Sequence, residues 1–224
     1  MKKLADNLWV DAAPQSFFGL HLGTRMTLIR LPDGGLLVYS PISLSAPMKA
    51  EVDSIGPVRH IVAPNIYHHL YAGEWKDAYP DAVLHAATGL EKRRKDLAID
   101  RALAGEADPD WRGSLQTMFL EGSMLNETVF LHTPSRTLIV ADVIENFETS
   151  PHWPMRMYLK MGGIHGKPGL SRPLRLVFRD KPASRRCIDQ MLDWDFDRIV
   201  LAHGDVIEQD GRDALRETYT WLKG

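Results

Sequence analysis

The chain has 224 residues, with 27 Lys and Arg against 29 Asp and Glu and a formal net charge of −2. This length predicts one domain spanning residues 1–224, and the near-neutral charge argues against a nucleic-acid partner or an anionic membrane surface. The single cysteine, Cys187, excludes an internal disulfide. No apolar run is long enough for a membrane span and no signal-peptide pattern is visible, so we expect a cytoplasmic protein.

The N-terminal third predicts β-structure interrupted by one helix. The turn Pro32-Asp33-Gly34-Gly35 separates two apolar runs and predicts a hairpin. Ser45 precedes a segment with helical spacing and is placed to cap it. The elements expected here are strands at 8–10, 26–31, 36–39 and 58–62 and a helix at 45–55.

The middle third predicts alternation of strands and helices. A segment rich in histidine and aromatic residues follows Pro64-Asn65, and a strongly charged segment follows Gly89; both favour helix. The elements expected here are helices at 68–75 and 89–103 and strands at 82–86, 115–120, 128–132 and 137–143.

The last third begins with the least regular stretch of the chain, residues 145–174, which carries paired glycines and four prolines. We expect a long loop there, acting as a lid, a binding loop or an oligomer arm. A helix at 184–194 opened by Pro182 and capped by Ser184, a strand at 196–201 and a helix at 212–222 complete the prediction. Two β-rich halves that each end in helices suit two sheets packed face to face with helices outside, and periodicity alone leaves a doubly wound α/β sheet open.

Three groups of polar side chains fall at the ends of predicted strands. His68 and His69 follow the strand at 58–62, Asp142 closes an apolar strand, and His203 closes the strand at 196–201. Strand ends are where an α/β fold places its sites. Imidazoles and a carboxylate are ligands for Zn²⁺, Fe²⁺ or Mn²⁺. These residues are therefore the candidate metal ligands.

The layout resembles the metallo-β-lactamase superfamily over nearly the whole chain. The run Leu138-Ile139-Val140-Ala141-Asp142 is similar to the strand that ends in the family's metal-bridging aspartate, and Val200-Leu201-Ala202-His203-Gly204-Asp205 is similar to its last histidine motif. The segment 65–75, with Glu127 and the stretch 132–137, resembles still more closely a bacterial branch known only as a domain of unknown function. The resemblance implies an α/β fold of four layers (αββα), with two mixed β-sheets packed face to face.

The departures from the family pattern predict a reduced metal site. Aligned on His69, the signature H-x-H-x-D-H has Pro64 and Ile66 in place of its two leading histidines and His68 in place of its aspartate. The histidine expected before Thr128 is also absent. The resemblance thus implies one metal at most.

The leading hypothesis is a mononuclear metal-dependent hydrolase acting on an unknown ester, lactone, thioester or phosphoester. Its ligands are His68, His69, Asp142 and His203, with Glu127 or a non-ligating His68 as the base. Zinc is the first choice of metal, with iron or manganese as alternatives. The competing hypothesis is a non-catalytic, metal-free descendant that binds a small molecule or a protein. The partner expected is an unknown small-molecule substrate, and a homodimer stays open.

Overall fold

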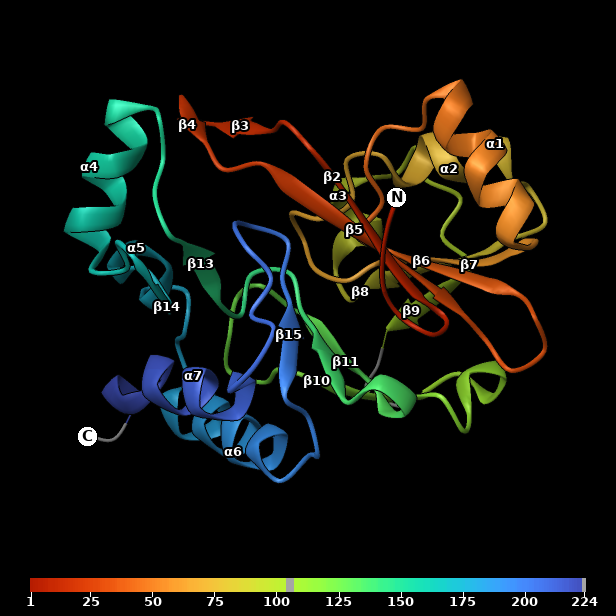
Figure 1. Cartoon of the computed structure of the whole chain (residues 1–224). Coiled ribbons are helices and arrows are strands. Elements are labelled where there is room, and N and C mark those ends of the chain that lie inside the picture. The colour runs from red at the N-terminus through yellow and green to blue at the C-terminus, as the bar shows by residue number, and fades with distance from the viewer. Residues whose placement is uncertain (104–106, 223–224) are drawn as a thin grey trace.

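The computed structural model of the chain describes residues 1–103 and 107–222. Its larger sheet has seven strands (Figure 1). Their order is β1 (Lys2–Ala5), β2 (Leu8–Ala13), β5 (Thr24–Arg30), β6 (Leu36–Tyr39), β7 (Val58–Ala63), β8 (Val83–Ala87) and β9 (Arg101–Leu103). Neighbours are antiparallel from β1 to β6 and parallel from β6 to β9. The sheet is therefore mixed.

The second main sheet has four strands and is also mixed. Its order is β10 (Leu115–Phe119), β11 (Thr128–His132), β12 (Thr137–Ile139) and β15 (Arg198–Val200), of which the last pair is parallel. Two small antiparallel two-stranded sheets stand outside the main sheets. One is the hairpin of β3 (Ser16–Phe17) with β4 (Leu20–His21), and the other pairs β13 (Glu145–Phe147) with β14 (Lys167–Gly169).

Helices cover the outer faces of both sheets. The α-helices are α1 (Ala46–Ile55), α2 (Ala72–Ala78), α3 (Leu90–Arg93), α4 (Trp153–Gly162), α5 (Arg172–Arg175), α6 (Lys181–Leu192) and α7 (Gly211–Thr218). Three short 3₁₀ turns lie at Pro109–Trp111, Thr133–Ser135 and Thr220–Leu222. Figure 1 shows α1 and α2 at one side of the molecule and α6 and α7 at the other. No helix among the described residues has both the length and the apolar character to cross a bilayer.

Three apolar layers hold the fold together. The central one lies between the sheets, where Tyr39 of β6 packs edge-on against Phe130 of β11 with ring centroids 5.2 Å apart. A second layer joins the seven-stranded sheet to α1 and α2 around Trp75, and a third joins the four-stranded sheet to α6 and α7 around Ile188. Burial of apolar surface on both faces of each sheet fixes the αββα order. The predicted fold class is confirmed.

Several predicted elements are confirmed at the level of local chemistry. The Ser45 hydroxyl accepts a hydrogen bond from the Met48 backbone N–H at 3.3 Å, so α1 begins where its cap predicts. Strands β5 and β6 pair antiparallel across the Pro32-Asp33-Gly34-Gly35 turn as the predicted hairpin. Strand β7 ends at Ala63, immediately before the Pro64-Asn65 pair.

Three predictions about regular structure are wrong. The helix expected at 89–103 stops after one turn at Arg93, and residues 101–103 instead form the edge strand β9, because backbone pairing with β8 outweighs the local helical pattern. The long loop expected at 145–174 contains α4 and α5. Prolines stand in the first turn of both, where a proline favours a helix. Helix α6 is capped by Asp180, which accepts from the Ala183 N–H at 2.9 Å, and not by Ser184.

Candidate metal centre

Three of the predicted ligands converge where β7, β12 and β15 end. The Nε2 atoms of His68 and His203 are 3.2 Å apart, and Asp142 Oδ1 lies 3.4 Å from the first and 3.2 Å from the second. In a tetrahedral site with metal–ligand distances of about 2.0–2.1 Å, ligand atoms lie about 3.3 Å from one another. We call His68, Asp142 and His203 the ligand triangle, since it has the size of one face of such a site.

The hydrogen bonds behind the triangle orient both imidazoles with Nε2 towards Asp142. His203 Nδ1 lies 2.7 Å from the Gly23 carbonyl oxygen. A carbonyl can only accept, so Nδ1 carries the proton and the Nε2 lone pair of a neutral His203 faces the Asp142 carboxylate. His68 likewise turns its Nδ1 to the Ser40 hydroxyl at 2.8 Å and its Nε2 to Asp142. A shared proton, such as an Nε2–H of His68, or a bound cation brings these atoms this close.

Burial and the contact between Asp142 and the imidazoles shift the pKa values of Asp142 and His203. Burial alone would raise the pKa of the Asp142 carboxyl, but His68 and His203 beside it hold that pKa well below its usual range. Burial would lower the pKa of His203, and the Asp142 carboxylate reverses this, so that the pKa is raised. The carboxylate is therefore ionised at neutral pH, as a metal ligand must be.

Asn65 connects the histidine segment to the aspartate. Its side-chain oxygen accepts from the backbone N–H groups of Tyr67 and His68 at 2.8 and 2.9 Å, which fixes the turn after β7. Its side-chain nitrogen donates to Asp142 Oδ2 at 2.8 Å and to Glu127 at 2.9 Å. The pair Pro64-Asn65 signalled a turn in the sequence, but the second role of the Asn65 amide was not predicted.

Glu127, predicted as a base or a replacement ligand, lies behind the triangle. It is fully buried, and its carboxylate accepts from the backbone N–H groups of Ala141 and Asp142 at 2.7 and 2.9 Å. Burial, together with the neighbouring Asp142, raises its pKa. All of these contacts position Asp142 and Asn65, and none faces a pocket.

The loop that carries His203 is fixed from two sides. Arg25 of β5 donates to the carbonyl oxygens of Leu201 and Gly204 at 2.5 and 2.7 Å. Gly204 has a φ of +97°, and a side chain there would collide with the Asn146 carbonyl. The glycine after His203 is thus required by a close backbone approach.

His69, the fourth predicted ligand, stands outside the triangle. Its Nδ1 lies 2.8 Å from the Arg94 guanidinium, which can only donate. Nδ1 is therefore the acceptor and Nε2 carries the proton of the neutral ring. Burial, with the Arg94 charge, lowers the pKa of His69 and keeps it neutral. A protonated Nε2 has no lone pair to offer a cation.

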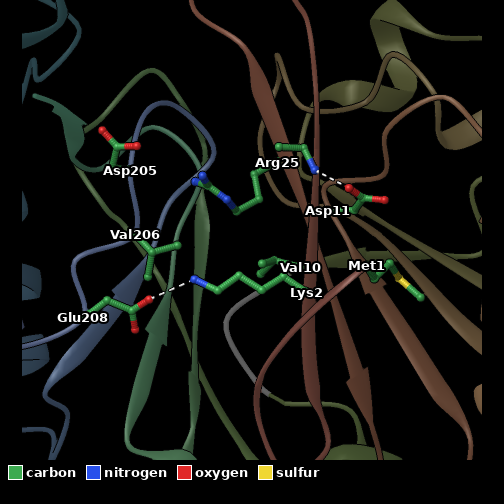
Figure 2. A pocket seen from close by; sticks show the side chains of 9 residues that line it. Met1, Lys2, Val10, Asp11, Arg25, Asp205, Val206 and Glu208 are labelled. Atoms are coloured by element: carbon green, nitrogen blue, oxygen red, sulfur yellow. Dashed lines mark hydrogen bonds and ion pairs between the residues drawn. The ribbon is translucent and has the colours of Figure 1, made fainter. Parts of the chain in front are cut away.

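Of two hollows among the described residues, one opens onto the triangle. A pocket of about 390 Å³ is lined by all three ligand residues and also by Tyr158 and Glu145. A larger hollow of about 480 Å³ lies beside β2 and β5, where Lys2 reaches Glu208 at 3.4 Å (Figure 2). This second hollow holds surface charges and no ligand of the triangle, so we place the functional site in the smaller pocket.

A second group of potential ligands, His60, His85 and Asp108, is buried beneath Trp111. The two imidazoles face each other at 3.0 Å, and the Asp108 carboxylate pairs with Arg101 and accepts the Asp110 N–H. The Asp108 carboxylate is thus paired with a cation of the chain. Among the described residues, the ion-pair partners of Asp142 are the two imidazoles, and no Lys or Arg pairs with it.

The fold is shared with metallo-β-lactamases of known structure. The metallo-β-lactamase from Pontibacter korlensis is 11% identical, with a TM-score of 0.68 over 100% of this chain and 98% of that one. The enzyme from Hirschia baltica is 12% identical, with a TM-score of 0.64 over 98% and 95%. The enzyme FIM-1 from Pseudomonas aeruginosa, solved in a mono-zinc form, is 10% identical, with a TM-score of 0.65 over 99% and 93%. At these identities the likeness shows the fold alone.

Comparison with curated proteins gives no match. A family model described as a domain of unknown function, DUF4336, matches residues 5–157, which hold His68 and Asp142 but not His203. That model covers more than half of the chain. The chain therefore belongs to the DUF4336 family, a divergent branch with the metallo-β-lactamase fold.

Proposed function

We propose that this protein is a hydrolase that holds one divalent cation, zinc in the first instance, between His68, Asp142 and His203. The observation that carries the proposal is the ligand triangle, whose three edges of 3.2 to 3.4 Å match a coordination face. A structure with this fold that is described in a mono-zinc form supports a single cation.

The residues around the triangle would keep it ready for a cation. The Gly23 carbonyl and the Ser40 hydroxyl hold the two imidazoles with Nε2 facing inward, and Asn65 and Glu127 hold Asp142. Outer hydrogen bonds of this kind set ligand orientation and basicity. The fourth side of the site opens to the pocket.

A bound cation of this kind lowers the pKa of a coordinated water to near neutrality and polarises a carbonyl oxygen. Hydrolysis of a carboxylic ester, lactone or thioester breaks the bond from the acyl carbon to its oxygen or sulfur. A water oxygen bonds to that carbon, and one water proton passes to the departing alcohol or thiol. The reaction needs no redox partner.

Metal content tests the proposal directly. Protein from cells supplied with zinc, iron and manganese should carry about one metal equivalent by elemental analysis, and His203→Ala and Asp142→Asn should lose most of it. His69→Ala is the matched control and should keep its metal, because His69 lies outside the triangle.

Less than a tenth of an equivalent in the wild type would overturn the metal site. Metal without turnover of any ester, lactone, thioester or phosphoester would instead favour the non-catalytic binding protein. Iron as the resident metal, again without hydrolysis, would overturn the hydrolase while leaving the ligand triangle in place.

A further inference from the structure

We propose that the pocket over the ligand triangle takes an uncharged acyl compound with an apolar chain or ring, and discriminates against phosphate esters. This inference rests on the proposed function for its reaction. It narrows the substrate from four ester classes to the carboxylic acyl ones.

The pocket walls are mostly apolar and come from three separate segments. The cavity of about 390 Å³ is within the range of about 300–1,000 Å³ of small-molecule sites. The β3–β4 hairpin supplies Phe17 and Leu20, the segment after β7 supplies Leu70, and the far wall is formed by Leu174 and Val177. Each methylene buried against such walls strengthens binding by about 4-fold.

Charge around the cavity disfavours an anion. The described lining contains no Lys or Arg, and it does contain the carboxylates of Asp142 and Glu145. Phosphate groups are recognised by Arg and Lys or by helix N-termini. A phosphate ester here would face these two carboxylates, whereas an acyl group carries no net charge.

His69 supplies a hydrogen-bond donor for such a group. Its ring lines the pocket, and Arg94 behind it occupies Nδ1 at 2.8 Å. The Arg94 guanidinium therefore fixes the tautomer in which Nε2 carries the proton, and the backbone carbonyls of Ile66 and His69 also lie within reach of the ring. A carbonyl oxygen accepts from such a donor.

Phe18 at the hairpin tip is an exposed apolar side chain. It is 91% exposed, lines the pocket, and has a φ of +47°, which a bulky side chain rarely adopts. Its ring packs edge-on against Phe17 with centroids 4.5 Å apart, and both residues line the pocket. The two rings offer an apolar contact to a ligand there.

Chain length and charge of the substrate test the inference. With zinc-supplemented protein, kcat/KM for p-nitrophenyl octanoate should exceed that for p-nitrophenyl acetate by at least about 10-fold, since six buried methylenes at full strength would give far more. p-Nitrophenyl phosphate should be turned over less than about one-hundredth as well as the octanoate. Equal rates for the two acyl esters, or preference for the phosphate, would overturn the inference.

A binding measurement separates the inference from the hydrolase proposal. The uncharged fluorophore N-phenyl-1-naphthylamine is titrated into wild type, Phe18→Asp, Leu70→Asp and the control Met161→Asp, an apolar residue that is 68% exposed on α4 outside the pocket. The two pocket variants should bind at least about 5-fold more weakly, and the control should match wild type. Circular dichroism verifies folding.

His69→Phe keeps the ring and removes the donor, so it should lower kcat/KM for the octanoate by at least about 10-fold with metal content unchanged. His69→Gln, which restores a donor, should recover part of this. Fluorophore binding that responds to the pocket variants, without metal or turnover, would sink only the proposed function. Turnover with no response to the pocket variants or to His69→Phe would sink only this inference.

Discussion

We expect the buried side chain of His132 to make the protein less stable at acidic pH. His132 is fully buried at the end of β11. Its Nδ1 faces the Ser135 hydroxyl at 2.6 Å, Ser135 donates to Thr137 at 2.9 Å, and Thr137 donates to the Ser135 carbonyl. This directed chain requires Nδ1 to carry the proton, and Nε2 is buried without a partner. A second proton would place a charge where no acceptor meets it.

Burial accordingly lowers the pKa of His132 to about 4, against about 6.5 in an unfolded chain. Between these values the unfolded state binds more protons, so stability is fully present above pH 6.5 and is lost as the pH falls towards 4. At pH 5.5 roughly nine-tenths of unfolded His132 is protonated and almost none of the folded form. This proton uptake costs about 1.4 kcal/mol of the free energy of unfolding relative to pH 7.5.

Urea unfolding at pH 7.5 and pH 5.5 measures this cost for wild type, His132→Leu and Ser135→Ala. The pH-dependent loss should be about 1.4 kcal/mol smaller in His132→Leu than in wild type, calculated from the shift in midpoint and the shared slope. Ser135→Ala keeps the imidazole and should keep the full loss. Equal losses in wild type and His132→Leu would refute the reasoning, because the buried ring would then titrate as it does in the unfolded chain.

Three further predictions concern the ligand triangle, Glu127 behind it, and the β3–β4 hairpin. Zinc at 100 times its dissociation constant should stabilise the wild type by about 2.7 kcal/mol. Calorimetry should therefore show Tm raised by roughly 5–10 °C. An equal rise in Tm for Asp142→Asn would exclude the triangle as the binding site. Glu127→Gln replaces one acceptor oxygen by a donor that faces backbone N–H groups. Zinc affinity measured by isothermal titration should therefore fall about 10- to 100-fold. If the variant bound zinc as tightly as the wild type, Glu127 would have no role in positioning Asp142. Phe18 has a left-handed backbone conformation, which asparagine adopts more easily than phenylalanine. Phe18→Asn should therefore raise the free energy of unfolding by about 1 kcal/mol. A loss of stability would show that the backbone at this position carries no strain.

Local sequence was sufficient to predict the strands that lead into the site, whereas His68, expected in a helix at 68–75, lies in the turn before α2. The sequence shows two apolar runs that lead to Asp142 and His203, and a helix that Ser45 caps. These features can be predicted because strand ends and caps depend on near neighbours in the chain. The resemblance on these motifs extended the prediction to the αββα fold, which the structural neighbours confirm. Convergence of His68, Asp142 and His203 was predicted from their places at strand ends, and the structure brings these three together.

Contacts between distant segments decided the rest. His69 was indistinguishable from His68 as a ligand in the sequence, and only Arg94, 25 residues away, turns its ring from the triangle. Glu127 carried no signal that the backbone N–H groups of Ala141 and Asp142 would enclose it. The strand at Arg101–Leu103 exists because β8 presents an unpaired edge to it. Hydrogen-bond partners and burial are set by the folded neighbourhood, whereas periodicity and caps are properties of the chain itself.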